Sequence, residues 1–276
     1  MIIWCASYPK SGNTWIRAII SSLLYSNDGI FNFYMLKKIG LFPRRYQFKE
    51  FTNNYIDLNN VSKYWIDAQK KINSDGKLRI FKTHNGNYNF SGNNFTDKNN
   101  TLAVIYIVRD PRNMITSLSN HYQYNFEEST DFLLDEKKIL LNKDPKYTSD
   151  ENVINLLGSW KSHYNSWKAT SNLLLIRYED LLMDVKSEIY RLSEFLRKFG
   201  HFDINDKKVE NIIETTSFEM LKKKEEHEGF EEAVNSKIKF FNLGPKNDWK
   251  NIVDKKLINK IENNFQNEMK ELKYLF

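Results

Sequence analysis

Residues 2–24 read IIWCASYPKSGNTWIRAIISSLL and carry the strongest fold signal in the chain. Residues 2–6 are continuously apolar, which predicts a short strand buried on both faces. Over residues 15–24 apolar side chains recur at helical spacing, and Pro9 and Gly12 mark a loop before them. The first N–H groups of a helix have no internal partners, so a strand, a loop and a helix in this order predict an anion site.

The rest of the chain alternates strands and helices. Further apolar runs predict strands at 78–82, 101–108 and 173–178. Helical patterns lie at about 113–124, 152–170, 185–199 and 254–272. This alternation predicts an α/β fold with a central parallel sheet flanked by helices. Ligands of such sheets bind beyond the carboxyl ends of the strands, which is where Lys10, Lys82, Arg109 and Tyr178 fall.

Composition limits the classes of function. The 276 residues fit one large domain spanning 1–276, and residues 27–60 and 127–150, which have weak periodicity, are interpreted as insertions or lids. A net charge of +6 suits an anionic cofactor but does not indicate a nucleic-acid partner. The single cysteine, Cys5, excludes an internal disulfide framework, and no histidine has metal-ligand spacing with it. Without a signal segment or membrane span, a cytoplasmic protein is expected.

The loop at residues 8–15 differs from a Walker A loop in residue order. A Walker A loop ends in Gly-Lys-Ser/Thr, whereas here Lys10 and Ser11 precede Gly12 and no earlier glycine is present. A magnesium-dependent, P-loop-like nucleotide kinase, with Asp110 as the metal ligand, is therefore kept only as an alternative.

The string YPKSGNTW instead resembles the 5′-phosphosulfate loop of the sulfotransferases that use 3′-phosphoadenosine 5′-phosphosulfate (PAPS). Only Asn13 departs from the pattern, where the family has a threonine. The resemblance implies a P-loop-like, nucleotide-kinase-like sulfotransferase of the cytosolic type, with PAPS as co-substrate and no metal. It assigns the cofactor loop to Lys10, Ser11, Gly12, Asn13, Thr14 and Trp15.

A second motif, Lys82-Thr83-His84, follows the second predicted strand. A cation beside a titratable ring can balance charge on a transferring group and accept a proton. The same string follows a strand in cytosolic sulfotransferases, where the histidine is the catalytic base. The resemblance therefore assigns the role of catalytic base to His84. It also places Lys82 at the sulfuryl oxygens and Lys10 at the leaving phosphate.

A third motif begins with Arg109 at the end of a predicted strand. Ser117 lies two helical turns further on, so a guanidinium and a hydroxyl can converge on one phosphate. The pair resembles the family's 3′-phosphate motif. Alternatively, Arg109 and Asp110 form a local ion pair at the helix start. As a magnesium ligand, Asp110 is disfavoured by the adjacent cation.

Shorter matches concern the adenine. Tyr178, Thr216 and Phe218 resemble residues of the family's adenine pocket, in which Trp15 and Phe218 would flank the base and Tyr178 would bond its edge. Each of these residues taken alone is more typical of core packing.

The string NLGPKNDWK at residues 242–250 resembles the family's lid over the 3′-phosphate and keeps Gly244. Asn242 and Leu243 stand where the family has arginine and lysine, so two cations are missing. Lys239 or Lys246 are candidate replacements, since lysine reaches a phosphate as a flexible point charge.

The resemblance covers residues 3–250 and implies in-line sulfuryl transfer to a hydroxyl or amine of a small-molecule or glycan acceptor. The oligomeric state and the acceptor stay open, as does a non-catalytic binder of adenosine phosphates or nucleic acid. One helix face is interpreted as a structural docking face: Trp160, His163, Tyr164 and Trp167. Aromatic candidates for the acceptor pocket are Phe31, Phe33, Tyr34, Tyr88, Phe90, Tyr122, Tyr124 and Phe126.

Overall fold

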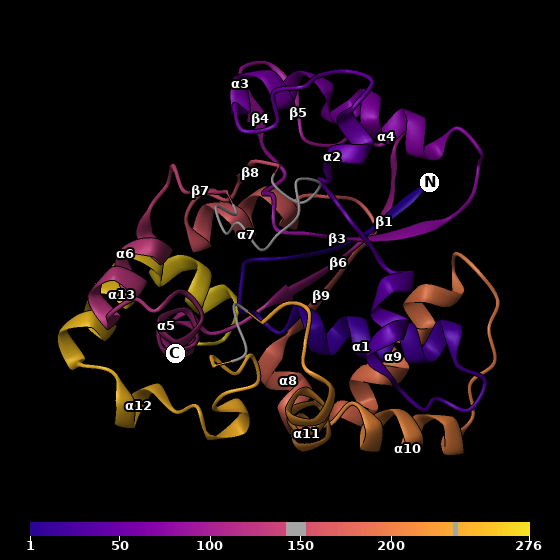
Figure 1. Ribbon diagram of the computed structural model, residues 1–276. Helices are drawn as coiled ribbons and strands as arrows, with labels where there is room; N and C mark the ends of the chain where they lie inside the picture. Colours follow the sequence, from indigo (N-terminus) through magenta and orange to yellow (C-terminus); the bar gives the residue numbers. More distant parts are fainter. Residues whose placement is uncertain (142–152, 234–236) are drawn as a thin grey trace. The chain divides into compact units, whose positions relative to one another are not determined.

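The computed structural model describes residues 1–141, 153–233 and 237–276. Its central element is a five-stranded parallel sheet with the order β2-β3-β1-β6-β9, flanked by helices (Figure 1). The strands are β1 (Ile2–Ser7), β2 (Gly40–Leu41), β3 (Arg79–Thr83), β6 (Thr101–Val108) and β9 (Leu173–Arg177). The predicted α/β fold with a central parallel sheet is therefore confirmed.

The register of β1 against β3 brings two predicted motifs to one end of the sheet. Cys5 lies opposite Lys82, and Ala6 lies opposite Thr83. All six residues of β1 are buried, as the uninterrupted apolar run predicts. His84 consequently follows β3 beside Ser7, the last residue of β1.

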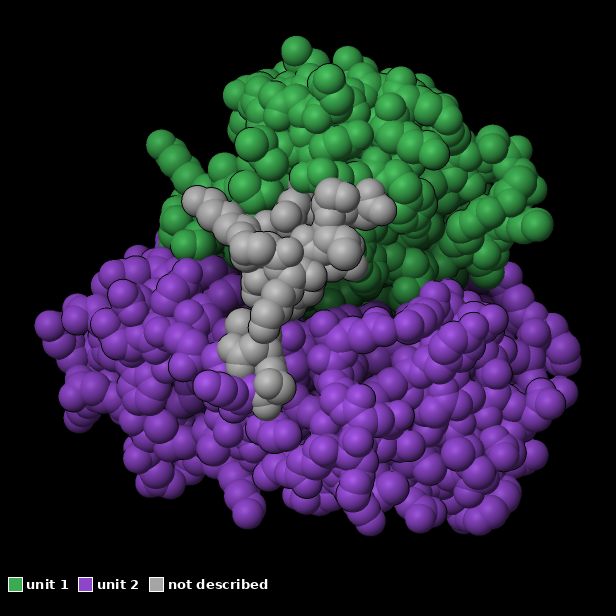
Figure 2. Space-filling model, viewed as in Figure 1, with its two compact units in different colours: residues 1–8, 39–106, 135–175 green, residues 9–38, 107–134, 176–276 purple. Residues whose placement is uncertain are grey.

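The chain forms two compact units (Figure 2). Unit 1 comprises residues 1–8, 39–106 and 135–175, and unit 2 comprises 9–38, 107–134 and 176–276. β1, β2 and β3 belong to unit 1, and the boundary falls within β6 and β9.

Unit 1 has an aromatic core. The ring of Trp4 lies 5.4 Å from that of Phe42, 5.4 Å from that of Phe95 and 6.4 Å from that of Trp167. The other elements of this unit are α2 (Arg45–Phe48), α3 (Leu58–Val61), η2 (Ser62–Tyr64), α4 (Trp65–Asn73), β4 (Asn89–Phe90), β5 (Asn93–Asn94), β7 (Ile139–Leu140), β8 (Asn155–Leu156) and α7 (Trp160–Lys168).

Unit 2 is mainly helical. One of its apolar clusters contains the buried residues Ala18, Phe31, Leu36, Leu221 and Phe241, with six partly buried side chains packed against them. Its elements are α1 (Asn13–Tyr25), η1 (Phe33–Lys38), α5 (Pro111–Tyr122), α6 (Phe126–Leu134), α8 (Tyr178–Met183), α9 (Val185–Arg197), α10 (Asp206–Thr215), α11 (Phe218–Glu228), η3 (Gly244–Lys246), α12 (Trp249–Ile252) and α13 (Lys255–Glu271).

The helix predicted at 152–170 is wrong in its first half; its first residue lies outside the described residues. Asn155–Leu156 is strand β8, paired antiparallel with β7, and the helix begins only at Trp160. Gly158 explains the break, because its φ of +67° is left-handed and a Cβ there would lie 2.4 Å from the Tyr88 hydroxyl. All four predicted strands and the other predicted helices are confirmed, with shifts at their ends.

Within the interval 27–60, the structure contains η1, β2 and α2, and β2 pairs with β3 at the edge of the central sheet. Within 127–150 it shows most of α6 and β7, and residues 142–150 lie outside the described residues. Among the described helices, none has the length and apolarity to cross a bilayer.

Candidate active site

The loop at residues 9–12, at the start of unit 2, has the backbone shape of an anion cradle. Lys10 and Gly12 both adopt positive φ, 66° and 99°, and α1 begins directly afterwards at Asn13. A Cβ on Gly12 would lie 2.5 Å from Cδ2 of Tyr178, so glycine is required by both conformation and space. Successive left-handed and helical residues ahead of a helix turn N–H groups toward one point, where an anion is favoured.

The side chains of this loop have distinct environments. The Lys10 ammonium lies 3.7 Å from the centroid of the Phe240 ring, a cation–π contact. Ser11 is fully buried, with its hydroxyl 3.8 Å from the sulfur of Met114. The Thr14 hydroxyl lies 3.3 Å from a carboxylate oxygen of Glu232. This carboxylate beside the loop is a feature that no sequence pattern indicated.

Arg109 is packed against the same loop. Its Nη1 donates to the carbonyl of Lys10 at 3.2 Å, and its guanidinium lies 4.3 Å from the centroid of the Tyr178 ring. The ring of Trp15 lies edge-on to that of Tyr178 at 5.7 Å. The structure therefore brings four predicted site residues together in unit 2. Ser117, half-buried, lies on α5 two turns beyond Arg109.

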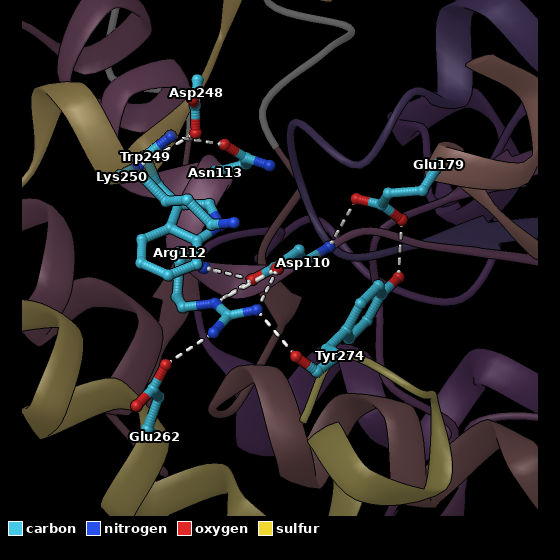
Figure 3. Close-up of polar contacts among 9 residues, drawn as sticks. All are labelled: Asp110, Arg112, Asn113, Glu179, Asp248, Trp249, Lys250, Glu262 and Tyr274. Atoms are coloured by element: carbon cyan, nitrogen blue, oxygen red, sulfur yellow. Dashed lines mark hydrogen bonds and ion pairs between the residues drawn. The ribbon is translucent and has the colours of Figure 1, made fainter. Parts of the chain in front are cut away.

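The carboxylate of Asp110 is engaged by Arg112 (Figure 3). Arg112 Nη2 lies 2.6 Å from Asp110 Oδ2 and also donates to the carbonyl of Tyr274, while Nη1 lies 2.5 Å from Glu262. Asp110 in addition accepts from the N–H of Arg112 and so caps α5. A carboxylate committed in this way is a poor magnesium ligand, which weakens the kinase alternative.

Glu179 joins the network from the opposite side of Asp110. One of its oxygens accepts from the Asp110 N–H at 3.0 Å, and the other accepts from the Tyr274 hydroxyl at 2.8 Å (Figure 3). Burial raises the pKa of the Glu179 carboxyl above its ordinary value. Within the described residues, no cluster of three histidine, cysteine, aspartate or glutamate side chains could hold a metal ion.

The predicted adenine residues lie mainly around one apolar cluster. Trp15 and Phe218 both pack against the cluster that contains Phe31. Gly244 has φ +53°, and a Cβ there would lie 2.5 Å from the Phe218 ring, so the lid glycine sits directly on that ring. Thr216 is fully buried and its hydroxyl donates to Ile212 within α10, so its donor is used inside the helix.

The lid is fastened to the start of α5. The Thr116 hydroxyl donates to Asn247 Oδ1 at 2.7 Å, and Asn247 Nδ2 donates to the carbonyl of Asn113 at 2.7 Å. Asn113 Oδ1 in turn accepts from the Trp249 N–H at 3.0 Å (Figure 3). Asn242 and both candidate replacement lysines, Lys239 and Lys246, are exposed.

In unit 1, His84 is held by the end of strand β1. Its Nδ1 lies 2.7 Å from the carbonyl of Ser7, and a carbonyl can only accept. The proton therefore sits on Nδ1, and Nε2 is the basic nitrogen. In this tautomer Nε2 is the nitrogen that can accept a proton. Lys82, two residues earlier, is half-buried near the end of β3.

The backbone after β3 is anchored by α7. His163 Nε2 lies 3.1 Å from the carbonyl of His84, its Nδ1 lies 2.8 Å from the Tyr106 hydroxyl, and Trp167 Nε1 donates to the carbonyl of Asn85. Burial lowers the pKa of His163 to about 3, so this ring is neutral. The helix face interpreted as a docking face is thus buried, and it also supports the His84 backbone.

The aromatic candidates for an acceptor pocket are divided between the two units. Phe31 belongs to an apolar cluster of unit 2, against which Phe33 and Trp15 pack. In unit 1, the Tyr88 hydroxyl donates to the carbonyl of Leu157, and burial raises the pKa of Tyr88 to about 12. These positions do not define the acceptor.

The fold is that of an α/β protein of the P-loop-like class, and the loop before its first helix has the backbone shape of an anion cradle. The sulfotransferase domain model matches residues 2–273, and the chain belongs to this family.

Similar proteins agree with this assignment. Mouse sulfotransferase 1E1 is 27% identical, with 96% of this chain and 82% of the mouse protein aligned. Rabbit amine sulfotransferase is 24% identical, covering 99% of this chain and 82% of the rabbit protein. A crystal structure of mouse sulfotransferase SULT7A1 complexed with PAP is similar in fold, with a TM-score of 0.61, 22% identity and coverage of 97% of this chain and 83% of that one.

Proposed function

We propose that this protein transfers the sulfuryl group of PAPS to a hydroxyl or amine of a small-molecule acceptor, with residues 1–276 acting as one sulfotransferase domain. The observation that carries the proposal is the left-handed turn at Lys10 and Gly12, with Arg109 and Tyr178 packed on it. The names of similar proteins, which include an amine sulfotransferase and a 3-alpha-hydroxysteroid sulfotransferase, support an acceptor of this kind.

Unit 2 would bind the cofactor. Lys10, the N–H groups of residues 11–14 and the Thr14 hydroxyl would hold the 5′-phosphate, and Arg109 with Ser117 would hold the 3′-phosphate. The aromatic residues of unit 2 suit the adenine ring, because adenine stacks on aromatic faces. In this arrangement Trp15 and Phe218 flank the adenine, Tyr178 bonds its edge and Thr216 completes the pocket. Gly244 belongs to the lid over the 3′-phosphate.

The reaction is an in-line displacement at sulfur. The acceptor oxygen or nitrogen forms a bond to sulfur while the bond from sulfur to the 5′-phosphate oxygen breaks, and that oxygen keeps the electron pair. His84 Nε2 takes the acceptor's proton, and Lys82 balances charge on the sulfuryl oxygens. Little covalent chemistry falls to the protein, so positioning and charge stabilisation dominate. We propose that no metal takes part.

Two alternatives make different predictions. A magnesium-dependent kinase is disfavoured by the loop order and by the commitment of Asp110 to Arg112. A non-catalytic binder would bind adenosine phosphates without turnover. Adenosine 3′,5′-bisphosphate, ATP with magnesium, and a random oligonucleotide distinguish these functions in calorimetry.

The sulfotransferase proposal predicts tight binding of the bisphosphate alone, followed by transfer of radiolabel from PAPS to a member of a panel of phenols, steroids and amines. Transfer should persist in a chelator. Tight binding of ATP with magnesium in place of the bisphosphate would overturn the proposal, and binding without transfer to any acceptor class would favour the binder.

A further inference from the structure

Arg17 lies on α1 one turn beyond the phosphate loop and is buried to 2% exposure. Its Nη2 lies 2.5 Å from Glu232 Oε1 and 3.3 Å from the Thr14 hydroxyl. In the described part of the chain its Nε, also buried, has no hydrogen-bond partner. A guanidinium placed among apolar helix residues is costly unless a specific anion is its partner.

Glu232 supplies an anion at this position. One oxygen pairs with Arg17 and the other accepts from Thr14, so a single carboxylate bridges the two. Thr14 belongs to the loop that we assign to the 5′-phosphate. Carboxylate and phosphate oxygens accept from the same guanidinium fork, so Glu232 occupies donors that equally suit a phosphate.

Arg17 is already oriented next to Thr14, with its Nη2 3.3 Å from the Thr14 hydroxyl. A buried arginine offers a fixed fork, and less conformational entropy is lost per hydrogen bond than with an exposed lysine.

We propose that Arg17 is a further cofactor-binding residue, which donates to the 5′-phosphate, and that Glu232 competes with the cofactor for Arg17 and Thr14. This rests on the proposed function. When the cofactor binds, its 5′-phosphate displaces the Glu232 carboxylate from Arg17. When the ion pair between Glu232 and Arg17 forms again, it assists release of the bisphosphate product. Glu232 thereby lowers the affinity of the protein for the cofactor.

The test compares Glu232→Gln with Glu231→Gln. Both substitutions remove one negative charge, but Glu231 is exposed and pairs with Lys37. Calorimetry uses adenosine 3′,5′-bisphosphate and adenosine 3′-phosphate, which lacks the 5′-phosphate. Glu232→Gln should tighten binding of the bisphosphate by about 3- to 10-fold and leave the monophosphate unchanged, whereas Glu231→Gln should change either by less than about 2-fold.

Substitutions of Arg17 itself should have the opposite effect and weaken binding of the bisphosphate. Arg17→Gln should weaken the bisphosphate by about 10- to 100-fold, the range of hydrogen bonds to a charged group, and Arg17→Lys should fall between this variant and the unmodified protein. The proposal would be overturned if Glu232→Gln and Glu231→Gln bound the bisphosphate equally tightly. It would also be overturned if Glu232→Gln or Arg17→Gln changed the affinities for the two nucleotides equally. If Arg17→Gln does not fold, the comparison of Glu232→Gln with Glu231→Gln tests the proposal without it. Failure of the unmodified protein to bind the bisphosphate would instead contradict the proposed function.

Discussion

The two units hold their functional side chains by different physical means. In unit 1, His84 is fixed by the carbonyl of Ser7, and its own carbonyl accepts from neutral His163. In unit 2, the cations are held on aromatic faces, with Lys10 over Phe240 and Arg109 over Tyr178.

This difference matches the proposed tasks. A base must exchange a proton near neutral pH, so its position and its tautomer must be fixed. A phosphate site needs concentrated positive charge, and aromatic rings stabilise cations without neutralising them. In unit 1 the two contacts that position His84 and its backbone are uncharged, with the cation Lys82 two residues earlier on β3, whereas in unit 2 the cations themselves are held ready for an anion.

The largest effect is expected for His84, the proposed base of unit 1. His84→Ala should lower kcat by about 10²- to 10⁴-fold, the usual contribution of a general base, while the affinity for adenosine 3′,5′-bisphosphate stays unchanged. Steady-state kinetics and calorimetry measure the two quantities, and His201→Ala, at an exposed histidine, is the control. A parallel loss of bisphosphate affinity would contradict the division between the units.

The charged network of Figure 3 should matter for folding. Arg112→Met leaves the carboxylates of Asp110 and Glu262 without their buried partner, and we expect a loss of about 3–5 kcal/mol in the free energy of unfolding. Urea denaturation measures it. Arg191→Met breaks the more exposed pair with Glu188 and should cost less than about 1 kcal/mol. Similar losses for the two variants would refute a special role for the buried network.

Lys10→Ala tests the charged side at the phosphate loop. Turnover should fall by about 10²- to 10³-fold, because one preorganised donor to the leaving phosphate is removed, and bisphosphate binding should weaken as well. Lys223→Ala, at an exposed lysine on α11, is the matched control. If Lys10→Ala lowered turnover but left bisphosphate binding intact, Lys10 would act on the sulfuryl group only.

Contiguous features were predictable from the sequence. Continuous apolar runs predicted the four longer strands, and the residue order around Gly12 separated this loop from a Walker A loop. Features that depend on distant residues were not: Arg17 and Glu232 are 215 positions apart, and periodicity carries no information about such a pair. The one local signal was a lone arginine in an apolar helix, three residues beyond Thr14.

Two local details also differ from what the pattern suggested. The alternative of an ion pair between Arg109 and Asp110 is not favoured, because Asp110 pairs with Arg112: capping α5 turns its carboxylate toward the first helical turn. The helix predicted from residue 152 ignored Gly158, which has a left-handed φ of +67° and lies too close to the Tyr88 hydroxyl for a side chain. Local helix capping decided the first outcome, and contacts with Tyr88 bear on the second.

The smallest expected effect concerns His163, which tests whether the supports of unit 1 must be neutral. Its folded pKa of about 3 lies below the ordinary value of 6.5, so the unfolded chain binds the proton more tightly and stability falls as the pH drops from 6.5 toward 3. Between pH 7 and pH 5 this single group should cost about 2 kcal/mol of unfolding free energy.

His163→Gln removes the titration but keeps a donor for the carbonyl of His84 and an acceptor for Tyr106. We expect its urea midpoint to vary less between pH 7 and pH 5 than that of the unmodified protein, whereas His201→Gln, at an exposed position, should leave the pH dependence unchanged. An identical pH dependence in His163→Gln and the unmodified protein would mean that His163 accepts a proton in the folded state. The support beneath His84 would then carry a charge in acid, and the contrast between a neutral unit 1 and a charged unit 2 would hold only near neutral pH.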